Sequence, residues 1–124
     1  MTKYDSQNIF AKILRGETPC EKIYEDKYVL SFKDVNPQAP SHTLIIPKGA
    51  YKDINDFGEN ATNEEIVGFN KAIPIIANKL GISEVSGGKG YRLISNAGSE
   101  ACQTVAHFHM HLLAGRNLGL MLVQ

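Results

Sequence analysis

Hydrophobic residues recur along the chain at two periods, one typical of helices and one typical of strands. Over residues 62–80, five apolar residues follow one another at steps of three and four, which predicts a long helix with one apolar face. Thr62 and Glu65 fit a capping box at its start, and Gly81 fits its end. Pro74 lies inside this helix and predicts a kink.

The remaining apolar segments are shorter. Residues 9–14 have the spacing of a short helix, with Asp5 or Ser6 as its cap, and Gly16 is expected to end it. Five runs are typical of strands, and they are Lys22–Glu25, Tyr28–Lys33, Ser41–Pro47, Tyr91–Ser95 and about Val105–Leu113. This order predicts an α+β domain with a mainly antiparallel five-stranded sheet, one long helix and one short helix.

Length and composition narrow the class of protein. The 124 residues predict a single domain over 1–124, and the 13 Lys and Arg balance the 13 Asp and Glu. A net charge of zero argues against a protein that binds nucleic acid or membranes through a broad basic surface. No segment resembles a signal peptide or a membrane span, so a cytoplasmic location is expected. Cys20 and Cys102 have neither metal-binding spacing nor a disulfide framework.

The histidines carry the clearest chemical signal. His107, His109 and His111 alternate with apolar residues in the last predicted strand. Because side chains of a strand point alternately to its two sides, the three imidazoles should form a row on one side, about 6.6 to 7 Å apart. The apolar residues between them, among them Phe108, should then pack against the long helix.

A functional site explains such a row better than a purely structural role of the histidines does, and two kinds of site are possible. Alternating imidazoles can bind zinc, since neutral histidine is a common metal ligand. They can also act as a nucleophile and as groups that move protons, since a free imidazole is mostly neutral at pH 7. Zinc would need a further ligand, and the sequence does not indicate one. The nucleophilic interpretation is therefore favoured, and the metal site remains an alternative.

The sequence resembles the histidine triad (HIT) family, in particular its histidine triad nucleotide-binding proteins. The motif His107-Phe108-His109-Met110-His111-Leu112-Leu113 matches the family pattern. Four further blocks are similar and occur in the same order, and they cover residues 9–13, 34–42, 44–48 and 96–99. The resemblance extends over about residues 7–116, so it implies a single HIT domain.

This resemblance implies a purine nucleoside phosphoramidase, which hydrolyses the P–N bond of adenosine or guanosine 5′-monophosphoramidates. His109 would be the nucleophile and would form a nucleotidyl-histidine intermediate that water then cleaves. His111 would contact a phosphoryl oxygen or the leaving group. His107 and His42 would orient His109 and handle its proton.

Further residues match positions of the family that hold the nucleotide. Asn96 and Thr104 would bind the phosphate, and Asp34 would accept hydrogen bonds from both ribose hydroxyls. The apolar slot for the base would be formed by Phe10, Ile13 and Val35. By themselves these residues could equally be a turn residue and core residues.

Some departures from the family pattern bear on cofactors and substrate. Certain members bind zinc through a Cys-x-x-Cys pair in the first helix together with histidines, and this chain has neither in the matching segments. We therefore expect no metal and no other cofactor. Cys102 stands where relatives often have glycine. The tail from Asn117 to Gln124 lacks the tryptophan of many members, which leaves the leaving-group preference open.

The resemblance also implies a homodimer, in which strand Tyr91–Ser95 and the long helix meet their mates and join two sheets. Three other functions stay open. One is a dinucleoside polyphosphate hydrolase of the same superfamily. The others are a nucleotide-binding regulatory module with vestigial activity and a metal-binding protein. Nucleotidyl transferases are disfavoured, because the chain is short and His111 is retained.

Overall fold

A computed structural model of the protein describes residues 3–122 and contains one five-stranded sheet. All neighbouring strands are antiparallel, in the order β1-β2-β3-β5-β4. The strands are β1 (Lys22–Glu25), β2 (Val29–Lys33), β3 (Ser41–Pro47), β4 (Tyr91–Ile94) and β5 (Met110–Ala114). The predicted α+β class with a five-stranded antiparallel sheet is confirmed.

Three α-helices and two short 3-10 helices complete the described part of the chain. They are α1 (Ile9–Leu14), α2 (Ile54–Asn60), α3 (Asn63–Leu80), η1 (Glu84–Ser86) and η2 (Ser99–Ala101). The prediction of only one short helix was wrong, because it missed α2. That helix has seven residues and buries one side chain, Phe57, so it contains no repeat of apolar residues that a helical period could reveal.

Helix α3 agrees closely with its prediction. Thr62 and Glu65 form the capping box, in which each residue's side chain accepts a hydrogen bond from the other's backbone N–H. Gly81 ends the helix in the left-handed conformation with φ of 72°, and its N–H donates to the carbonyl groups of Ala77 and Asn78. The helix continues through Pro74, and the kink there stays a prediction.

The cap predicted for α1 was wrong. Asn8 caps the helix, because its side chain accepts the N–H of Ala11. Asp5 instead forms the turn before the helix, where its carboxylate accepts the Gln7 N–H and its carbonyl accepts the Asn8 side-chain amide. Both Asp5 and Asn8 are good helix caps, so local sequence alone does not distinguish between them.

The start predicted for the last strand was also wrong, because β5 begins at Met110 rather than near Val105. The last ladder pair with β3 is Ile45 with Met110. Before it, the Phe108 N–H donates to the Tyr51 carbonyl at 2.7 Å, outside the sheet. Residues 105–109 therefore run as an irregular segment, although their side chains still point alternately to two sides.

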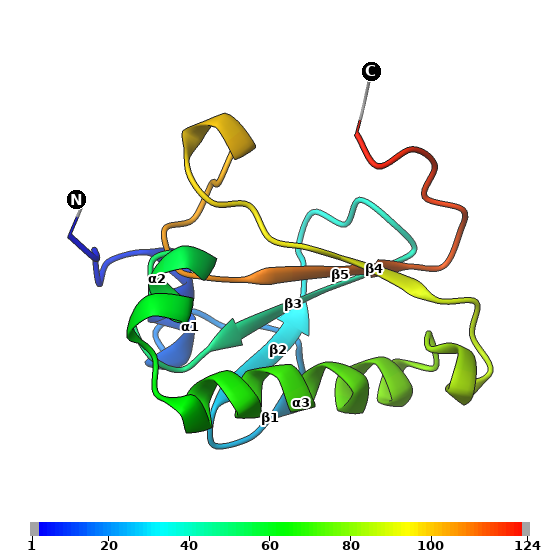
Figure 1. Ribbon diagram of the computed structural model, residues 1–124, viewed down its shortest axis with the longest axis horizontal. Helices are drawn as coiled ribbons and strands as arrows, with labels where there is room; N and C mark the ends of the chain where they lie inside the picture. The colour runs from blue at the N-terminus through cyan, green and yellow to red at the C-terminus, as the bar shows by residue number, and fades with distance from the viewer. Residues whose placement is uncertain (1–2, 123–124) are drawn as a thin grey trace.

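The sheet carries a separate apolar core on each face. The larger core lies between the sheet and α3, which runs along one face in Figure 1, and it includes Phe57, Phe69 and Phe108. The smaller core packs Phe10 of α1 on side chains of β2 and β3. Because opposite residues of an antiparallel pair share a face, the second face also carries His42 and His111.

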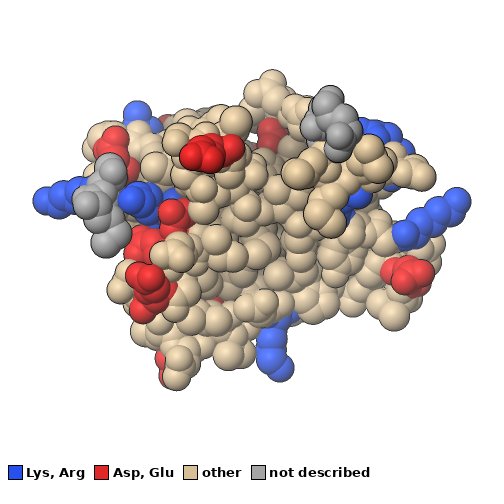
Figure 2. All heavy atoms as spheres, turned by 45° about the horizontal axis from the view of Figure 1, so that its top comes forward, with Lys and Arg blue, Asp and Glu red and all other residues tan. Residues whose placement is uncertain are grey.

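The charged residues are mixed over the surface. Figure 2 shows Lys and Arg side chains scattered among Asp and Glu on one face, with wide neutral areas between them. This distribution agrees with the balanced composition of the chain. Within residues 3–122, no helix has both the length and the apolar character needed to span a membrane.

Candidate active site

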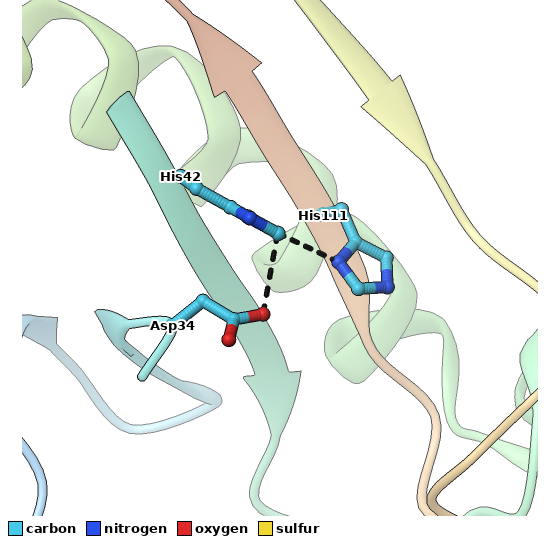
Figure 3. Close-up of side chains that lie close together, drawn as sticks. All are labelled: Asp34, His42 and His111. Carbon is cyan, nitrogen blue, oxygen red and sulfur yellow. Dashed lines mark hydrogen bonds and ion pairs between the residues drawn. The ribbon is translucent and has the colours of Figure 1, made fainter. Parts of the chain in front are cut away.

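Two of the histidines meet across neighbouring strands. His42 of β3 and His111 of β5 lie on the same face of the sheet, because Leu44 is paired with His111 and His42 with Leu113. Figure 3 shows the two rings side by side, and His42 Nε2 lies 2.9 Å from His111 Nδ1. The register of two strands thus joins residues 69 positions apart in the sequence.

The other two histidines come from the irregular segment before β5. Phe108 lies between them and points into the larger core, where its ring contacts those of Phe57 and Phe69 at centroid distances of 4.9 and 5.0 Å. His107 and His109 therefore point to the opposite side, and the His109 ring lies 5.1 Å from that of His111. The predicted division into imidazoles on one side and apolar residues on the other is confirmed, although only His111 lies in a ladder strand.

The hydrogen-bond partners of His107 determine which of its nitrogens carries hydrogen. Nε2 lies 2.9 Å from the carbonyl oxygen of Pro47, and a carbonyl can only accept, so Nε2 carries the hydrogen. Nδ1 is then an acceptor, and the Tyr4 hydroxyl donates to it at 2.6 Å. The His107 side chain is fully buried, with both ring nitrogens paired.

The same reasoning leaves one nitrogen of His109 free to react. Its Nδ1 lies 2.7 Å from the His107 carbonyl and must donate to it. In the neutral ring, Nε2 therefore holds a lone pair. The edge-on ring of Phe10 lies 4.9 Å from the His109 ring, and the Ser95 hydroxyl donates to the His109 carbonyl.

His42 and His111 form a directed pair. The backbone N–H of Gln38 donates to His42 Nδ1 at 2.9 Å, so the His42 hydrogen is on Nε2. From there it donates to His111 Nδ1, while Asp34 Oδ2 lies 3.3 Å away as a second acceptor. Neutral His111 then carries its hydrogen on Nε2, where it can donate to a bound ligand.

Burial lowers the pKa of all four histidines below the usual 6.5, because a charged ring loses hydration. For His111 the pKa falls to about 4, first through burial and then through repulsion from His109 and His42. The Asp34 carboxylate acts in the opposite direction on His42, His109 and His111. At neutral pH the four rings are therefore uncharged, which suits a nucleophile.

These shifts predict an acid-sensitive fold. An unfolded histidine takes up its proton near pH 6.5, whereas folded His111 does so near pH 4. Between these values the unfolded chain binds more protons, so the free energy of unfolding should fall as the pH falls. Thermal unfolding from pH 7.5 to 4 measures the change in stability, and NMR titration of the histidine rings measures their pKa values.

Asp34→Asn should lower the pKa of His109 further, because the Asp34 carboxylate raises it in the wild type. An unchanged or raised pKa would contradict this electrostatic account.

The structure places the other predicted site residues at different distances from the histidines. Phe10 lies against His109, and Asp34 lies against His42. Ile13 packs in the smaller core beside Phe10. Val35 is 89% exposed on the loop after β2. The two proposed phosphate ligands, Asn96 and Thr104, lie in the segment between β4 and β5, and among the described residues neither forms a hydrogen bond with a histidine.

Sequence reasoning missed several partners of the histidines. Tyr4 lies outside every motif and reaches His107 only through the fold. The Pro47 carbonyl and the Gln38 N–H are backbone groups, which no residue type indicates. Pro47 is the last residue of the predicted strand Ser41–Pro47, but its role at the site depends on its carbonyl and not on its side chain.

One group of side chains could approach a metal ion. The candidate ligand atoms of Asp34, His42 and His111 lie within 4.8 Å of one another. However, His42 Nδ1 already accepts a hydrogen bond, so its Nε2 carries hydrogen and has no lone pair for a metal. The hydrogen bonds thus favour proton handling by this group, and the expectation of no metal stays a prediction.

Comparison with known proteins identifies the family of this chain. The family model described as the HIT domain matches residues 15–118. The chain belongs to the HIT family. Relatives extend over almost its whole length. A HIT-like protein of Azospirillum brasilense is 50% identical over 121 residues, which are 98% of this chain and 96% of that protein.

Two further HIT proteins are similar in sequence or structure. The purine nucleoside phosphoramidase of Escherichia coli is 44% identical over 117 residues, covering 94% of this chain and 93% of its own. The structure of a HIT family hydrolase from Clostridium thermocellum superposes with a TM-score of 0.83 and 40% identity, covering 96% of this chain and 99% of that one. The fold described above is therefore the HIT fold.

Proposed function

We propose that this HIT protein is a purine nucleoside phosphoramidase that hydrolyses the P–N bond of adenosine or guanosine 5′-monophosphoramidates. The observation that carries the proposal is the hydrogen bond from His109 Nδ1 to the His107 carbonyl, which leaves the lone pair on Nε2. The lowered pKa of His109 keeps that lone pair available at neutral pH. The E. coli relative named as a phosphoramidase supports the choice of substrate.

The reaction would proceed in two displacements at phosphorus. His109 Nε2 attacks the α-phosphorus, the bond from phosphorus to the leaving amine breaks, and the amine takes a proton from water. In the resulting nucleotidyl-histidine the ring is positively charged, and Nδ1–H still donates to the His107 carbonyl. Water then attacks phosphorus, and the P–Nε2 bond breaks. The proton that this water releases neutralises the hydroxide left when the amine was protonated.

The neighbouring groups would hold the substrate in place. His111 Nε2–H would donate to a phosphoryl oxygen, because His42 already donates to its Nδ1. Asn96 and Thr104 would add hydrogen bonds to the phosphate. Asp34 would accept the two ribose hydroxyls: its side chain is 17% exposed, and a carboxylate has acceptor capacity beyond its contact with His42. The base would lie against Phe10, Ile13 and Val35.

The test is hydrolysis of a fluorogenic adenosine phosphoramidate without added metal, compared with hydrolysis of a diadenosine polyphosphate. We expect the phosphoramidate to have the higher kcat/KM, and rapid quenching should trap a nucleotide on the protein, detectable by mass spectrometry. Preference for the polyphosphate would instead support the related hydrolase. Binding of AMP without any turnover would support a regulatory module.

We also propose that the protein is a homodimer joined at β4. This strand forms one edge of the sheet and pairs only with β5 among the described strands. Tyr91 and Leu93 lie on it with 38% and 37% exposure. A second copy would cover this edge, as two-fold partners commonly do.

Sedimentation velocity tests the dimer. Wild-type protein should sediment as a dimer, and Leu93→Lys should shift it towards monomer by placing a charge in the proposed interface. Ile54→Lys is the matched control, since Ile54 lies on α2 with a similar 40% exposure. A monomeric wild type, or equal effects of the two substitutions, would contradict the proposed interface.

A further inference from the structure

The N-terminal segment reaches the histidine site through one side chain. The Tyr4 hydroxyl donates to His107 Nδ1 at 2.6 Å, across 103 positions of sequence. The two rings also meet edge to face, with centroids 5.7 Å apart. We propose that Tyr4 is a positioning residue of the active site, which fixes the His107 ring and thereby the place of the His107 carbonyl that accepts the Nδ1–H of His109. The inference rests on the proposed function, in which His109 is the nucleophile.

Several contacts fix the position of Tyr4 before α1. The turn at Asp5 binds the Gln7 N–H, the Asn8 N–H and the Asn8 side chain. The Arg15 guanidinium donates to the Ser6 carbonyl at 2.7 Å from the other end of the helix. The segment that carries Tyr4 is thus bound to α1, whose Phe10 ring also faces His107 and His109.

His107 needs a donor at Nδ1 to keep its arrangement. Its Nε2–H donates to the Pro47 carbonyl. The ring is fully buried, so solvent water cannot reach Nδ1 to replace a missing donor. Without the Tyr4 hydroxyl, Nδ1 would be a buried acceptor with no donor, which is a costly state for a polar atom. Tyr4 supplies that donor.

His107, which Tyr4 contacts, also supports the nucleophile His109. The His107 carbonyl accepts the Nδ1–H of His109 at 2.7 Å and so selects the lone pair on His109 Nε2. His107 is therefore fixed at three points: its two ring nitrogens and its carbonyl oxygen. Tyr4 acts on His109 only through His107 and need not touch the substrate.

Removing the hydroxyl should also change the proton affinity of His107. The hydroxyl oxygen could also accept a hydrogen from a protonated Nδ1, so its loss leaves a charged His107 ring with an unpaired N–H in a buried apolar site and lowers the pKa of His107 further. Among the residues that the structure describes, the titratable groups that face this ring are Tyr4 and His109. Because a charged His107 repels charge on the neighbouring His109, turnover in the variant should persist to a lower pH than in the wild type.

The experiment is Tyr4→Phe, which keeps the ring and removes one hydroxyl. We expect kcat for the adenosine phosphoramidate to fall about fivefold, the effect of one hydrogen bond, with KM almost unchanged. The acidic limb of the pH profile should move to lower pH. Tyr24→Phe is the matched control, because its hydroxyl donates at 2.8 Å to Asp26, next to β1. It should leave kcat and the pH profile as in the wild type.

NMR of the His107 ring gives a second readout that needs no activity. In the wild type the ring should keep hydrogen on Nε2, and in Tyr4→Phe it should take up a second proton only at a lower pH than in the wild type. Wild-type kcat, pH profile and ring titration in Tyr4→Phe would overturn the inference, as would equal losses in both tyrosine variants. If the wild type fails to cleave phosphoramidates, the proposed function fails, and the NMR titration alone decides the role of Tyr4.

Discussion

His109→Ala should lower kcat/KM for the adenosine phosphoramidate by about 10⁴-fold or more, as expected when the attacking group of a covalent mechanism is removed. The variant has no Nε2 lone pair, so no nucleotidyl-protein can form. Steady-state kinetics measures the loss, and mass spectrometry of quenched reactions should find the adduct only on wild-type protein.

A binding measurement separates this chemical role from a structural one. Within residues 3–122 the His109 side chain makes a single hydrogen bond, to the His107 carbonyl, so its loss should leave the fold intact. Calorimetric titration with AMP should therefore give an affinity within about tenfold of the wild type. His111→Ala is the matched comparison, because it removes a neighbouring imidazole that does not attack phosphorus. Residual activity of His109→Ala equal to that of His111→Ala would contradict the assignment of the nucleophile.

Phe108→Ala should destabilise the protein by about 3 to 5 kcal/mol, the usual cost of emptying a buried phenylalanine site. Phe108 is 1% exposed and contacts the rings of Phe57 and Phe69. Since a domain of this kind is stable by only about 5 to 15 kcal/mol, the substitution should remove a large share of its free energy of unfolding. Urea denaturation at pH 7.5 measures this loss.

Two controls test whether the loss comes from packing. Phe108→Leu retains part of the buried volume and should cost less than Phe108→Ala. Val85→Ala changes a side chain that is 89% exposed in η1 and should shift the free energy of unfolding by less than about 0.5 kcal/mol. A Phe108→Ala loss as small as that of Val85→Ala would show that the larger core does not depend on this ring.

Much of the fold could be predicted from local patterns. Helix α3 was predicted with both ends correct, because its cap, its apolar spacing and its final glycine all act within a few residues. The strand Ser41–Pro47 was equally clear from its β-branched residues. Helix α2 and the start of β5 were missed, because α2 has a single buried side chain and β5 begins where Phe108 finds a partner outside the sheet.

The candidate site was predictable in its residue types but not in its bonding. The alternation of His107, His109 and His111 with apolar residues was enough to place three imidazoles on one side. The meeting of His42 with His111 depends on the register of β3 and β5. The contact of Tyr4 with His107 depends on how α1 packs against the sheet.

The sequence by itself thus determined the class of fold, the family and the row of imidazoles, since each follows from spacing between near neighbours. The tertiary structure decided the state of those imidazoles. Backbone carbonyls of Pro47 and His107 and the N–H of Gln38 select the hydrogen position on each ring. Burial lowers each pKa. The Pro47 carbonyl lies 60 positions from His107 in the sequence, whereas the His107 carbonyl and the Gln38 N–H lie two and four positions from their histidines. All three are backbone groups whose direction is set by the fold, and that is why residue types alone do not reveal which nitrogen is free to react.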